Sequence, residues 1–436
     1  MKTNNIYKTL KQNERLINYL RFYKDIDRSE LSRKLQLSMP TIYAATDHLK
    51  EYNIILKEKN AISLNKSYGI LVGISVGSSL CKISFLNFDF SPFDTHAFSG
   101  HKAALYEKIR CIISDYELLD KCILSTEKSY IYFKTPGTFS ELKSILNCVF
   151  EYIQDCIESN ILNILSIGIS CTGIINSKTN TIMSAPNLNY LENLTLDTLI
   201  FPDKQLFFDA NDIYVCLIQN SDASVIAEKI DLLLSDHIYK SAKNIVSLYL
   251  GVGTGAGLYL GQLYSGISGY SGEIGHLRAP VCESDEDMRK YQDAIQKNKL
   301  KHSCTCGMAD CYDHKIRSFV FEKTAEDFCD MSSSEIREYL NQNPEKAKLL
   351  GKYLGNMVNT LTSLLNIELV IFTGKFHHSM DLLINHIDAT RDESSLKLSR
   401  TDCKIISSRY GSQAPSIGAA IYAYQKKYDL EMSFEY

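Results

Sequence analysis

Residues 251–257 read Gly251-Val-Gly-Thr-Gly-Ala-Gly257 and directly follow Asn244-Ile-Val-Ser-Leu-Tyr-Leu250, an apolar run that is typical of a buried strand. A loop this rich in glycine leaves backbone N–H groups free to approach an anion closely. A glycine hairpin that binds no ligand is the alternative. Two further segments follow, Gly269-Tyr-Ser-Gly-Glu-Ile-Gly-His276 and Cys304-Thr-Cys-Gly-Met-Ala-Asp-Cys311, and the three together decide the predicted fold.

The cysteine spacing in the last segment indicates a metal centre. Cys304, Cys306 and Cys311 are spaced C-x-C-x4-C, and His276 lies upstream of them. Three thiolates and one imidazole satisfy the tetrahedral coordination of zinc and leave no open position, so we expect a structural zinc ion. Cys282 and His302 are alternatives for the fourth ligand, and a redox-active or chance cluster is the alternative to a metal site.

The three segments resemble the ROK family, which is named for repressors, open reading frames and kinases. Its members carry G-x-G-x-G, G-E-x-G-H and C-x-C-G-x-x-G-C in this order, and here Asp310 replaces the last glycine. The resemblance implies an α/β chain whose main part is a two-lobed, actin-like (ribonuclease H-like) sugar-kinase fold. It also implies that His276 binds zinc, that Glu273 binds a sugar hydroxyl, and that Asp313 replaces a sugar-binding glutamate.

The resemblance covers roughly residues 10–425. Ile167-Gly-Ile-Ser-Cys-Thr-Gly173 is similar to the family's G-I-x-x-P-G, and Ser184-Ala-Pro-Asn-Leu188 matches A-P-N-L. Residues 206–213 are interpreted as a strand ending in Asn-Asp, which places Asp212 where the family's sugar kinases hold their catalytic base, with Asp209 as an alternative register. The residues expected to bind the effector are Asn187, Asn211, Asp212, Glu273, His276 and Asp313.

Two departures from the family's motifs predict that ATP-dependent catalysis is lost. In Leu71-Val-Gly-Ile-Ser-Val-Gly-Ser-Ser79, Ser75 stands where the family's D-x-G-x-T has the aspartate, and Thr373 replaces one glycine of a G-G pair. Phosphoryl transfer depends on positioning and on charge neutralisation by Mg²⁺, so losing that carboxylate is a severe defect. We expect no catalytic residue, with Asp212 a vestigial base. The alternatives are an active ROK sugar kinase with a DNA-binding head, or a regulator controlled by a protein partner.

The N-terminal residues read as a winged helix-turn-helix. Residues 13–23 have helical apolar spacing, Asp27-Arg-Ser-Glu30 has the capping-box form, and Ser38 is a suitable N-cap for a helix that runs to about Tyr52. Two short strands are expected at 54–57 and 61–65, about a turn at residues 59–60. This order is typical of a winged helix-turn-helix. A three-helix protein-interaction module is the alternative.

The second helix of this motif would enter the major groove of an operator. Its outward-facing residues are expected to be Ser38, Met39, Thr41, Tyr43, Ala44 and His48, and the phosphate contacts Lys34, Lys50, Lys57 and Lys59. Its first turn has no Arg or Lys to read a base edge. Residues 1–66 nevertheless hold 13 Lys and Arg against 7 Asp and Glu, in a chain with net charge −4. We therefore expect only this head to contact double-stranded DNA.

The bulk composition is that of a globular cytoplasmic protein. Hydrophobic residues make up 45% of the chain, and no run of about 18 apolar residues is present, so we expect no membrane insertion. The chain has 13 cysteines but shows no signal peptide, so most of the cysteines are expected to be reduced and buried.

Four units are predicted: the head at 1–67, an N-terminal lobe at 68–185, a C-terminal lobe with the zinc site at 186–411, and a returning helix at 412–436. The motifs are similar to those of ROK repressors of xylose and N-acetylglucosamine operons. We expect a homodimer or homotetramer in which a sugar or sugar phosphate closes the lobes and changes the spacing of the heads. The sequence leaves open whether the sugar releases DNA or promotes its binding.

Overall fold

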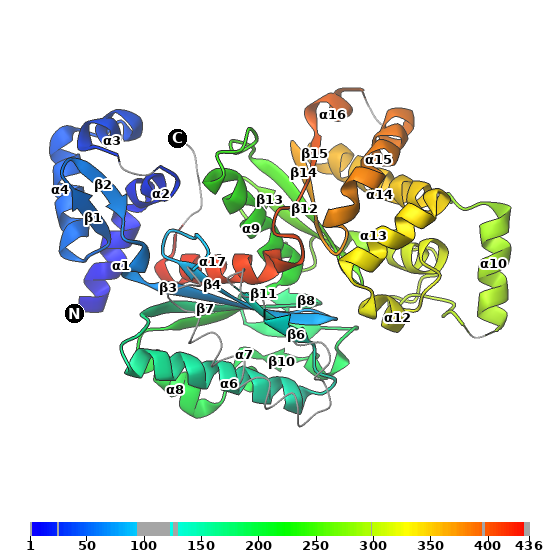
Figure 1. Cartoon of the computed structure of the whole chain (residues 1–436), viewed down its shortest axis with the longest axis horizontal. Helices are drawn as coiled ribbons and strands as arrows, with labels where there is room; N and C mark the ends of the chain where they lie inside the picture. The colour runs from blue at the N-terminus through cyan, green and yellow to red at the C-terminus, as the bar shows by residue number, and fades with distance from the viewer. Residues whose placement is uncertain are drawn as a thin grey trace.

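The computed structural model describes residues 2–23, 26–93, 123–124, 130–297, 299–394 and 397–430. Figure 1 shows a small helical head beside a larger body made of two α/β lobes. None of the helices in these ranges combines the length and the apolar character that crossing a membrane requires. Residues 431–436 of the predicted returning helix lie outside the described residues.

The head is formed by helices followed by a β-hairpin. Asp27 accepts a hydrogen bond from the Glu30 N–H and Ser38 accepts one from the Thr41 N–H, so both expected N-caps are present. The hairpin turns at Lys59, which has a positive φ of 56°. The elements are α1 (Lys2–Gln12), α2 (Glu14–Phe22), α3 (Arg28–Leu35), α4 (Met39–Glu51), β1 (Ile55–Glu58) and β2 (Ala61–Leu64).

Lobe 1 is built on a mixed sheet with the strand order β11-β7-β3-β4-β6-β5. Its α6 (Phe139–Glu158) and α8 (Pro202–Ala210) cover one face, while α17 (Ala414–Tyr428) covers the other. A small sheet of β8 (Ile174–Asn176), β9 (Thr181–Ser184) and β10 (Leu194–Thr195) is followed by α7 (Leu196–Leu199). The main strands are β3 (Ile70–Val76), β4 (Leu80–Asn87), β5 (Ile123–Leu124), β6 (Tyr130–Lys134), β7 (Ile164–Cys171) and β11 (Tyr214–Gln219).

Lobe 2 has a sheet with the order β13-β12-β14-β15. Val246 and Leu248 of β12 pack against α14 and α15, whereas Ile245 packs with Val225 of α9 on the opposite face. The chain segments are α9 (Asn220–Leu234), β12 (Asn244–Leu250), β13 (Thr254–Leu260), α10 (Asp285–Gln296), α11 (Tyr312–Lys315), α12 (Ala325–Asp330), α13 (Ser333–Gln342), α14 (Pro344–Leu365), β14 (Leu369–Gly374), α15 (Met380–Ser394), α16 (Lys397–Asp402) and β15 (Lys404–Ser407).

The predicted fold class is confirmed, but two details of the prediction are wrong. Residues 206–210 belong to helix α8, because Pro202 at its first position favours helix initiation, and the strand follows at Tyr214–Gln219. This strand, β11, pairs in parallel with β7 in the sheet of lobe 1. The expected boundary at residue 185 is therefore too early, and the chain passes into lobe 2 between Gln219 and Asn220.

Helix α17 returns from lobe 2 and packs closely against the sheet of lobe 1. A Cβ at Gly73 would lie 1.8 Å from the Ser416 carbonyl oxygen, and one at Gly168 would lie 1.8 Å from that of Ala419. On its other side, a Cβ at Gly418 of α17 would lie 1.7 Å from the Ala223 oxygen of α9. Only glycine permits such close approach of backbones, so α17 is held between β3, β7 and α9.

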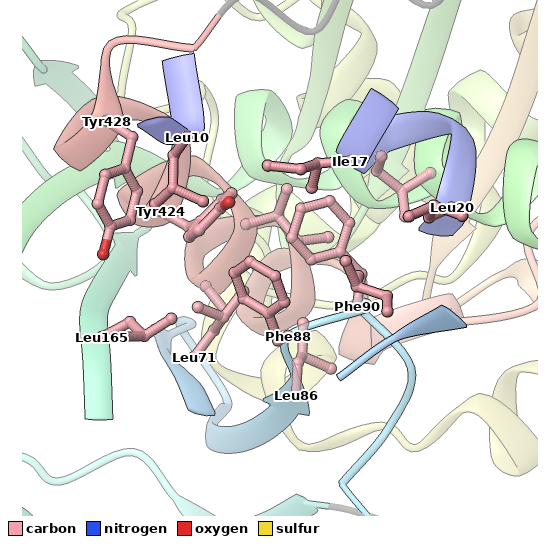
Figure 2. Packing of buried hydrophobic residues seen from close by; sticks show 14 of the residues in the cluster. Leu10, Ile17, Leu20, Leu71, Leu86, Phe88, Phe90, Leu165, Tyr424 and Tyr428 are labelled. Carbon is pink, nitrogen blue, oxygen red and sulfur yellow. The ribbon is translucent and has the colours of Figure 1, made fainter. Parts of the chain in front are cut away.

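The head is docked on the far end of α17 through a shared apolar core. Figure 2 shows Leu10, Ile17 and Leu20 of the head beside Phe88, Phe90, Tyr424 and Tyr428 of the body, and all belong to one buried cluster. Figure 1 shows the head at the C-terminal end of α17. A continuous core of this kind makes the head move with the body rather than independently of it.

Arg21 of α2 reinforces this docking. Its side chain is 3% exposed, and its guanidinium carbon lies 4.0 Å from the Phe90 ring centroid, 4.9 Å from that of Tyr424 and 5.2 Å from that of Phe88. Its Nε donates to the Phe88 carbonyl oxygen at 3.3 Å. A desolvated cation surrounded by aromatic faces is strongly stabilised, so Arg21 fixes the position of the head on the body.

Candidate effector cleft and metal centre

The predicted metal ligands come together at one point of lobe 2. The ligand atoms of His276, Cys304, Cys306 and Cys311 all lie within 4.8 Å of one another. The Cys304 Sγ is 3.8 Å from His276 Nδ1, and the Cys306 Sγ is 3.8 Å from the Cys311 Sγ. Bonds of about 2.3 Å to a tetrahedral ion place the ligand atoms about 3.8 Å apart, so the cluster has the dimensions of a zinc site.

The surroundings of Cys304 favour the thiolate form of this cysteine. The hydrogen bond with Cys311, and after it the one with His276, holds the pKa of the Cys304 thiol below its ordinary value. The His314 N–H also points at Cys311 Sγ at 3.4 Å. Thiolate is the form that binds metal, so these contacts prepare the site. His276 is the fourth member of the cluster, and neither Cys282 nor His302 belongs to it.

A cleft of about 820 Å³ lies between the lobes, directly beside this cluster. Four of the predicted effector residues line it: Asn187, Glu273, His276 and Asp313. Glu273 Oε1 accepts a hydrogen bond from Gln219 Nε2 at 2.8 Å, which connects lobe 2 to the end of β11 in lobe 1. Carboxylate and amide groups converging on one cleft are the contacts that a polyol ligand requires.

The glycine-rich segment forms the turn of the β12–β13 hairpin and one wall of the cleft. The Thr254 N–H donates to Asp313 Oδ1 at 2.8 Å, and a Cβ at Gly253 would lie 2.9 Å from Asp313 Oδ2. A Cβ at Gly275 would lie 2.4 Å from Asp313 Oδ1. The glycines therefore allow the hairpin and the loop that carries His276 to close around the Asp313 carboxylate.

Asp313 is almost completely buried, and this burial changes the pKa of its carboxyl group. Burial raises the pKa of its carboxyl group to about 6, against the opposing effect of the Arg317 and His276 charges. Its Oδ2 lies 4.0 Å from His276 Nδ1. The His/Cys cluster and the cleft are therefore one connected structure, in which His276 joins the cluster to the cleft wall.

Asn211 and Asp212 lie outside the cleft, which corrects the expectation that they bind the effector. Both follow the C-terminal end of α8, because the strand begins only at Tyr214. Asp212 accepts a hydrogen bond from Tyr7 Oη of the head at 3.3 Å and forms an ion pair with Lys427 of α17 at 3.1 Å. Its carboxylate therefore belongs to the contact between head and body, and it is not a vestigial base.

The residues that occupy the expected position are Gln219, Asn220 and Ser221, at the end of β11. Within the described residues, Asn220 Oδ1 and Ser221 Oγ are buried without a hydrogen-bond partner. The sequence signal for them was a buried strand ending in a polar run, Tyr214-Val-Cys-Leu-Ile-Gln-Asn-Ser-Asp222. That signal was missed because the preceding apolar residues of α8 were interpreted as the strand.

The other half of the cleft includes the lysines Lys82 and Lys375. Lys82 of β4 is 6% exposed and donates to the Ser412 carbonyl oxygen at 2.6 Å, and burial lowers its pKa to about 7. Lys375 Nζ donates to the carbonyl oxygens of Cys329 at 2.6 Å and Met331 at 2.9 Å. Ser75, at the position of the family's aspartate, is buried in β3.

Contacts across the cleft also join the β3–β4 turn to α12. The Ser79 Oγ donates to the Cys329 carbonyl oxygen at 2.8 Å, and the Cys329 Sγ lies 3.2 Å from the Ser78 carbonyl oxygen. The Lys134–Asp330 ion pair at 3.4 Å spans the same gap. These contacts connect the β3–β4 turn of lobe 1 to lobe 2.

The predicted DNA-contacting residues lie on the head, away from the cleft. Ser38, Met39, Thr41, Tyr43 and Ala44 are exposed along α3–α4, and His48 is half-buried, with its ring against Tyr52 at 5.4 Å. The lysines proposed to contact phosphate are all exposed: Lys34, Lys50, Lys57 and Lys59. His48 is the member of the set that points partly inward, because it also lies 3.5 Å from Thr9 Oγ1 of α1.

Arg28 is a basic residue beside α4 that the sequence did not reveal. Its guanidinium carbon lies 4.2 Å from the Tyr43 ring centroid, and its Nε donates to Thr46 Oγ1 at 2.9 Å. It also forms an ion pair with Asp47. Arg28 belongs to the preceding helix, so only the packing of α3 on α4 places its charge beside Tyr43 on α4.

Comparisons with known proteins agree on one family. A model described as "ROK family" matches residues 107–426. The xylose repressor of Bacillus spizizenii is 20% identical over 413 residues, which cover 90% of this chain and 89% of that protein. The xylose repressor of Caldicellulosiruptor bescii is 22% identical over 306 residues, covering 67% of this chain and 60% of the relative.

Solved structures show the same fold. A ROK family transcriptional regulator described as a homologue of the E. coli MLC protein has a TM-score of 0.64 at 18% identity, covering 97% of this chain and 95% of its own. A ROK family glucokinase from Streptomyces griseus, solved with glucose and AMPPNP, has a TM-score of 0.50 at 17% identity, covering 82% and 100%. The regulator therefore matches the head as well as the body, whereas the kinase matches the body.

Proposed function

Since the chain belongs to the ROK family, we propose that it is a sugar-responsive transcriptional repressor of carbohydrate-utilisation genes. The observation that carries the proposal is the joining of two sites by one helix. Ser412 lines the cleft just before α17 begins, and Tyr424 and Tyr428 near the other end of α17 form the core under the head. The names of the xylose repressors and the likeness to a ROK regulator support this function.

The sugar would bind between the lobes. Asn187 and Gln219 of lobe 1 and Glu273 of lobe 2 offer amide and carboxylate groups to its hydroxyls, and Asp313 adds a buried acceptor at the floor. A ligand that contacts both lobes stabilises the closed arrangement, because only that arrangement satisfies all of its hydroxyls. Movement of the lobes would carry α17, and with it the head.

Zinc would be held by His276, Cys304, Cys306 and Cys311 in a structural role. The ion would supply a fixed cross-link between the loop that carries Glu273 and the loop that carries Asp313. The protein's own residues would then present both carboxylates to the cleft in a constant geometry. His276 would therefore act on the sugar mainly through the position of the loop.

ATP-dependent catalysis would be lost. At the end of β11, Gln219 and Asn220 present amides to the cleft and Ser221 presents a hydroxyl. None of these three groups accepts a proton at neutral pH. Ser75 supplies no metal-binding carboxylate, and Lys82 and Lys375 occupy the half of the cleft that a nucleotide would need. Transfer of phosphate requires a positioned base and Mg²⁺ ligands, which these residues do not provide.

DNA binding would use two heads in a homodimer. One α4 would enter each major groove, with Lys57 and Lys59 of the β1–β2 hairpin against the adjacent backbone. Half-sites lie a fixed helical distance apart, so a change in the spacing of the two heads would alter the affinity.

The proposal is tested with full-length protein and DNA that it selects from a random pool. Its affinity for that DNA is titrated by fluorescence anisotropy with and without a panel of aldoses, and ATP consumption is measured in parallel. We expect one class of carbohydrate to change the DNA affinity at least tenfold without consuming ATP, an effect of about 1.4 kcal/mol. Sugar-dependent ATP consumption would contradict the proposal and favour a kinase.

A further inference from the structure

A smaller cavity of about 230 Å³ opens from the side of the cleft and is strongly basic. It adjoins the cleft, because Ser78, Asn187, Val252, Thr305 and Arg317 line both. Its charged lining residues are Lys301, Arg317, Lys323 and Glu326. His314 also lines it. The cavity therefore carries an excess of positive charge beside the proposed sugar site.

Arg317 is the central residue of this cavity. It lies in a π-helical turn, Ile316–Val320, and its side chain is 7% exposed. Its Nη1 donates to the Val252 carbonyl oxygen at 3.3 Å and its Nη2 to Cys304 Sγ at 3.6 Å, but it forms no ion pair in the part of the chain that the structure describes. A guanidinium has five N–H donors, so donors remain for a ligand.

Lys301 and Lys323 add positive charge to the cavity lining, and Lys323 can contact a ligand. Lys301 forms an ion pair with Glu326 at 2.7 Å, which neutralises the acidic member of the cavity. Lys323 is exposed and forms no ion pair among the described residues, and its backbone N–H donates to the Arg317 carbonyl oxygen at 3.0 Å. This hydrogen bond fixes Lys323 next to Arg317, so the two cations can approach one ligand group from the cavity wall.

We propose that the effector is an anionic carbohydrate, whose polyol part lies in the cleft against Asn187 and Glu273 and whose anionic group lies in the smaller cavity against Arg317 and Lys323. This inference rests on the proposed function and names the chemical class of its effector. Arginine suits a phosphate or carboxylate, because its planar N–H groups pair with two oxygens at once. Asn187 lines both cavities and would contact the ligand at the junction of its two parts.

The experiment measures ligand affinities of the zinc-loaded full-length protein by isothermal titration calorimetry. The ligands are glucose and xylose, glucose 6-phosphate and glucose 1-phosphate, glucuronate, and inorganic phosphate alone. We expect an anionic sugar to bind at least tenfold more tightly than its neutral parent, and its affinity to fall as NaCl rises. The phosphate and carboxylate arms distinguish the two anionic groups, and inorganic phosphate measures the anion subsite alone.

Lys323→Gln is the decisive variant, because an exposed side chain can be changed without affecting folding. It should weaken binding of the anionic sugar three- to tenfold and leave any binding of the neutral sugar unchanged. Lys348→Gln, an exposed lysine of α14 outside both cavities, is the matched control and should change neither. Arg317→Lys retains the charge but loses the paired donors, and should weaken anionic binding at least as much.

Two results would overturn the inference. The first is a neutral sugar that binds as tightly as its phosphorylated or oxidised form. The second is unchanged anionic binding in the Lys323→Gln variant. If neutral sugars alone bind and change the affinity for DNA, the anionic effector is wrong and the proposed function stands. If no carbohydrate of either kind alters DNA binding, the proposed function itself fails.

Discussion

Only a few residues connect the cluster of His276 and the three cysteines to the cleft between the lobes. His276 contributes to the cluster and to the cleft wall, and Asp313 follows Cys311 by two positions and accepts from the turn of the β12–β13 hairpin. Any change in the cluster must therefore alter the placement of the carboxylates in the cleft. Substituting single cysteines therefore tests the metal assignment without any measurement of DNA binding.

Cys306→Ser should remove most of the bound metal, because the exposed Cys306 is a ligand whose loss leaves three protein ligands. Elemental analysis should show about one zinc per chain in the native protein and much less in the variant. The control is Cys282→Ser, a cysteine outside the cluster, which should keep its zinc. Equal zinc in Cys306→Ser and the native protein would refute the assignment.

Glu228 should make stability depend on pH. Burial raises the pKa of this α9 carboxyl group from 4.5 to about 8, so the folded state holds the proton more tightly than the unfolded state does. The free energy of unfolding should therefore fall as the pH rises from about 4.5 to 8, since ionisation is penalised only in the folded state. Below about pH 4.5, the Glu228 carboxyl group no longer makes the free energy of unfolding depend on pH.

The Glu228→Gln variant should lack this dependence, because an amide cannot ionise. Urea unfolding at several pH values between 5 and 9 should show the variant gaining stability relative to the native protein as the pH rises. Glu345→Gln, on the exposed surface of α14, serves as the comparison and should follow the native curve. A constant difference between Glu228→Gln and native protein across the window would argue against the raised pKa.

At the scale of elements, α17 is the connection on which the function depends. Its glycine contacts hold it against β3, β7 and α9, and its aromatic end is shared with α1 and α2 of the head. Asp212, which sequence motifs assigned to the sugar, lies at this junction between Tyr7 and Lys427. The end of α8 therefore contributes to the position of the head and not to sugar chemistry.

Arg21→Ala should loosen the head from the body. The change removes a buried cation from three aromatic faces and leaves a cavity, so we expect the free energy of unfolding to fall by about 2–4 kcal/mol. Hydrogen exchange in α1 and α2 should speed up more than exchange in the sheet of lobe 2. Lys8→Ala, an exposed change on α1, should leave both measurements unaltered. If α1 and α2 of the Arg21→Ala variant kept their protection from hydrogen exchange, the aromatic contacts of Arg21 would not be what holds the head on the body.

The wing should contribute phosphate contacts without sequence preference. Replacing Lys59 at the tip of the β1–β2 hairpin by Gln should weaken binding to all DNA sequences alike and reduce the slope of log affinity against log salt by about 1. Filter binding of several DNA fragments at a series of salt concentrations measures both effects, with Lys348→Gln as the comparison. A selective loss on one sequence would instead indicate base reading by the wing.

Sequence reasoning succeeded where local spacing carries the information. The caps at Asp27 and Ser38, the β12–β13 hairpin and the clustering of one histidine with three cysteines all depend on residues near one another in the chain or on motif spacing. These constraints are written in short motifs, so they could be predicted. The α/β fold followed from the same motifs.

Sequence reasoning failed where packing between distant segments determines the structure. The apolar residues of α8 and of β11 are adjacent in the chain, and hydrophobicity alone did not show that the first is a helix and the second a buried strand. Ser221 and Gln219 were missed for this reason, and Arg28 because it reaches α4 only through the packing of α3. The basic cavity gathers Lys301, Arg317 and Lys323 through tertiary structure.

In the whole molecule, we expect the cleft and the DNA-binding head to be two coupled sites. The cleft lies between the lobes. The head lies at the C-terminal end of α17 (Figure 1), where it shares a buried apolar core with the body (Figure 2). Coupling between sites is reciprocal: if the sugar changes the affinity for DNA, DNA must change the affinity for the sugar by the same factor. This reciprocity distinguishes true coupling from a sugar effect on aggregation or stability.

The most direct test is calorimetric titration of the effector into full-length protein, first alone and then saturated with the DNA that it selects. We predict that the dissociation constant for the sugar differs between the two titrations by the factor, at least tenfold, by which the sugar changes the affinity for DNA. An identical dissociation constant with and without DNA would contradict the claim that the cleft controls the head.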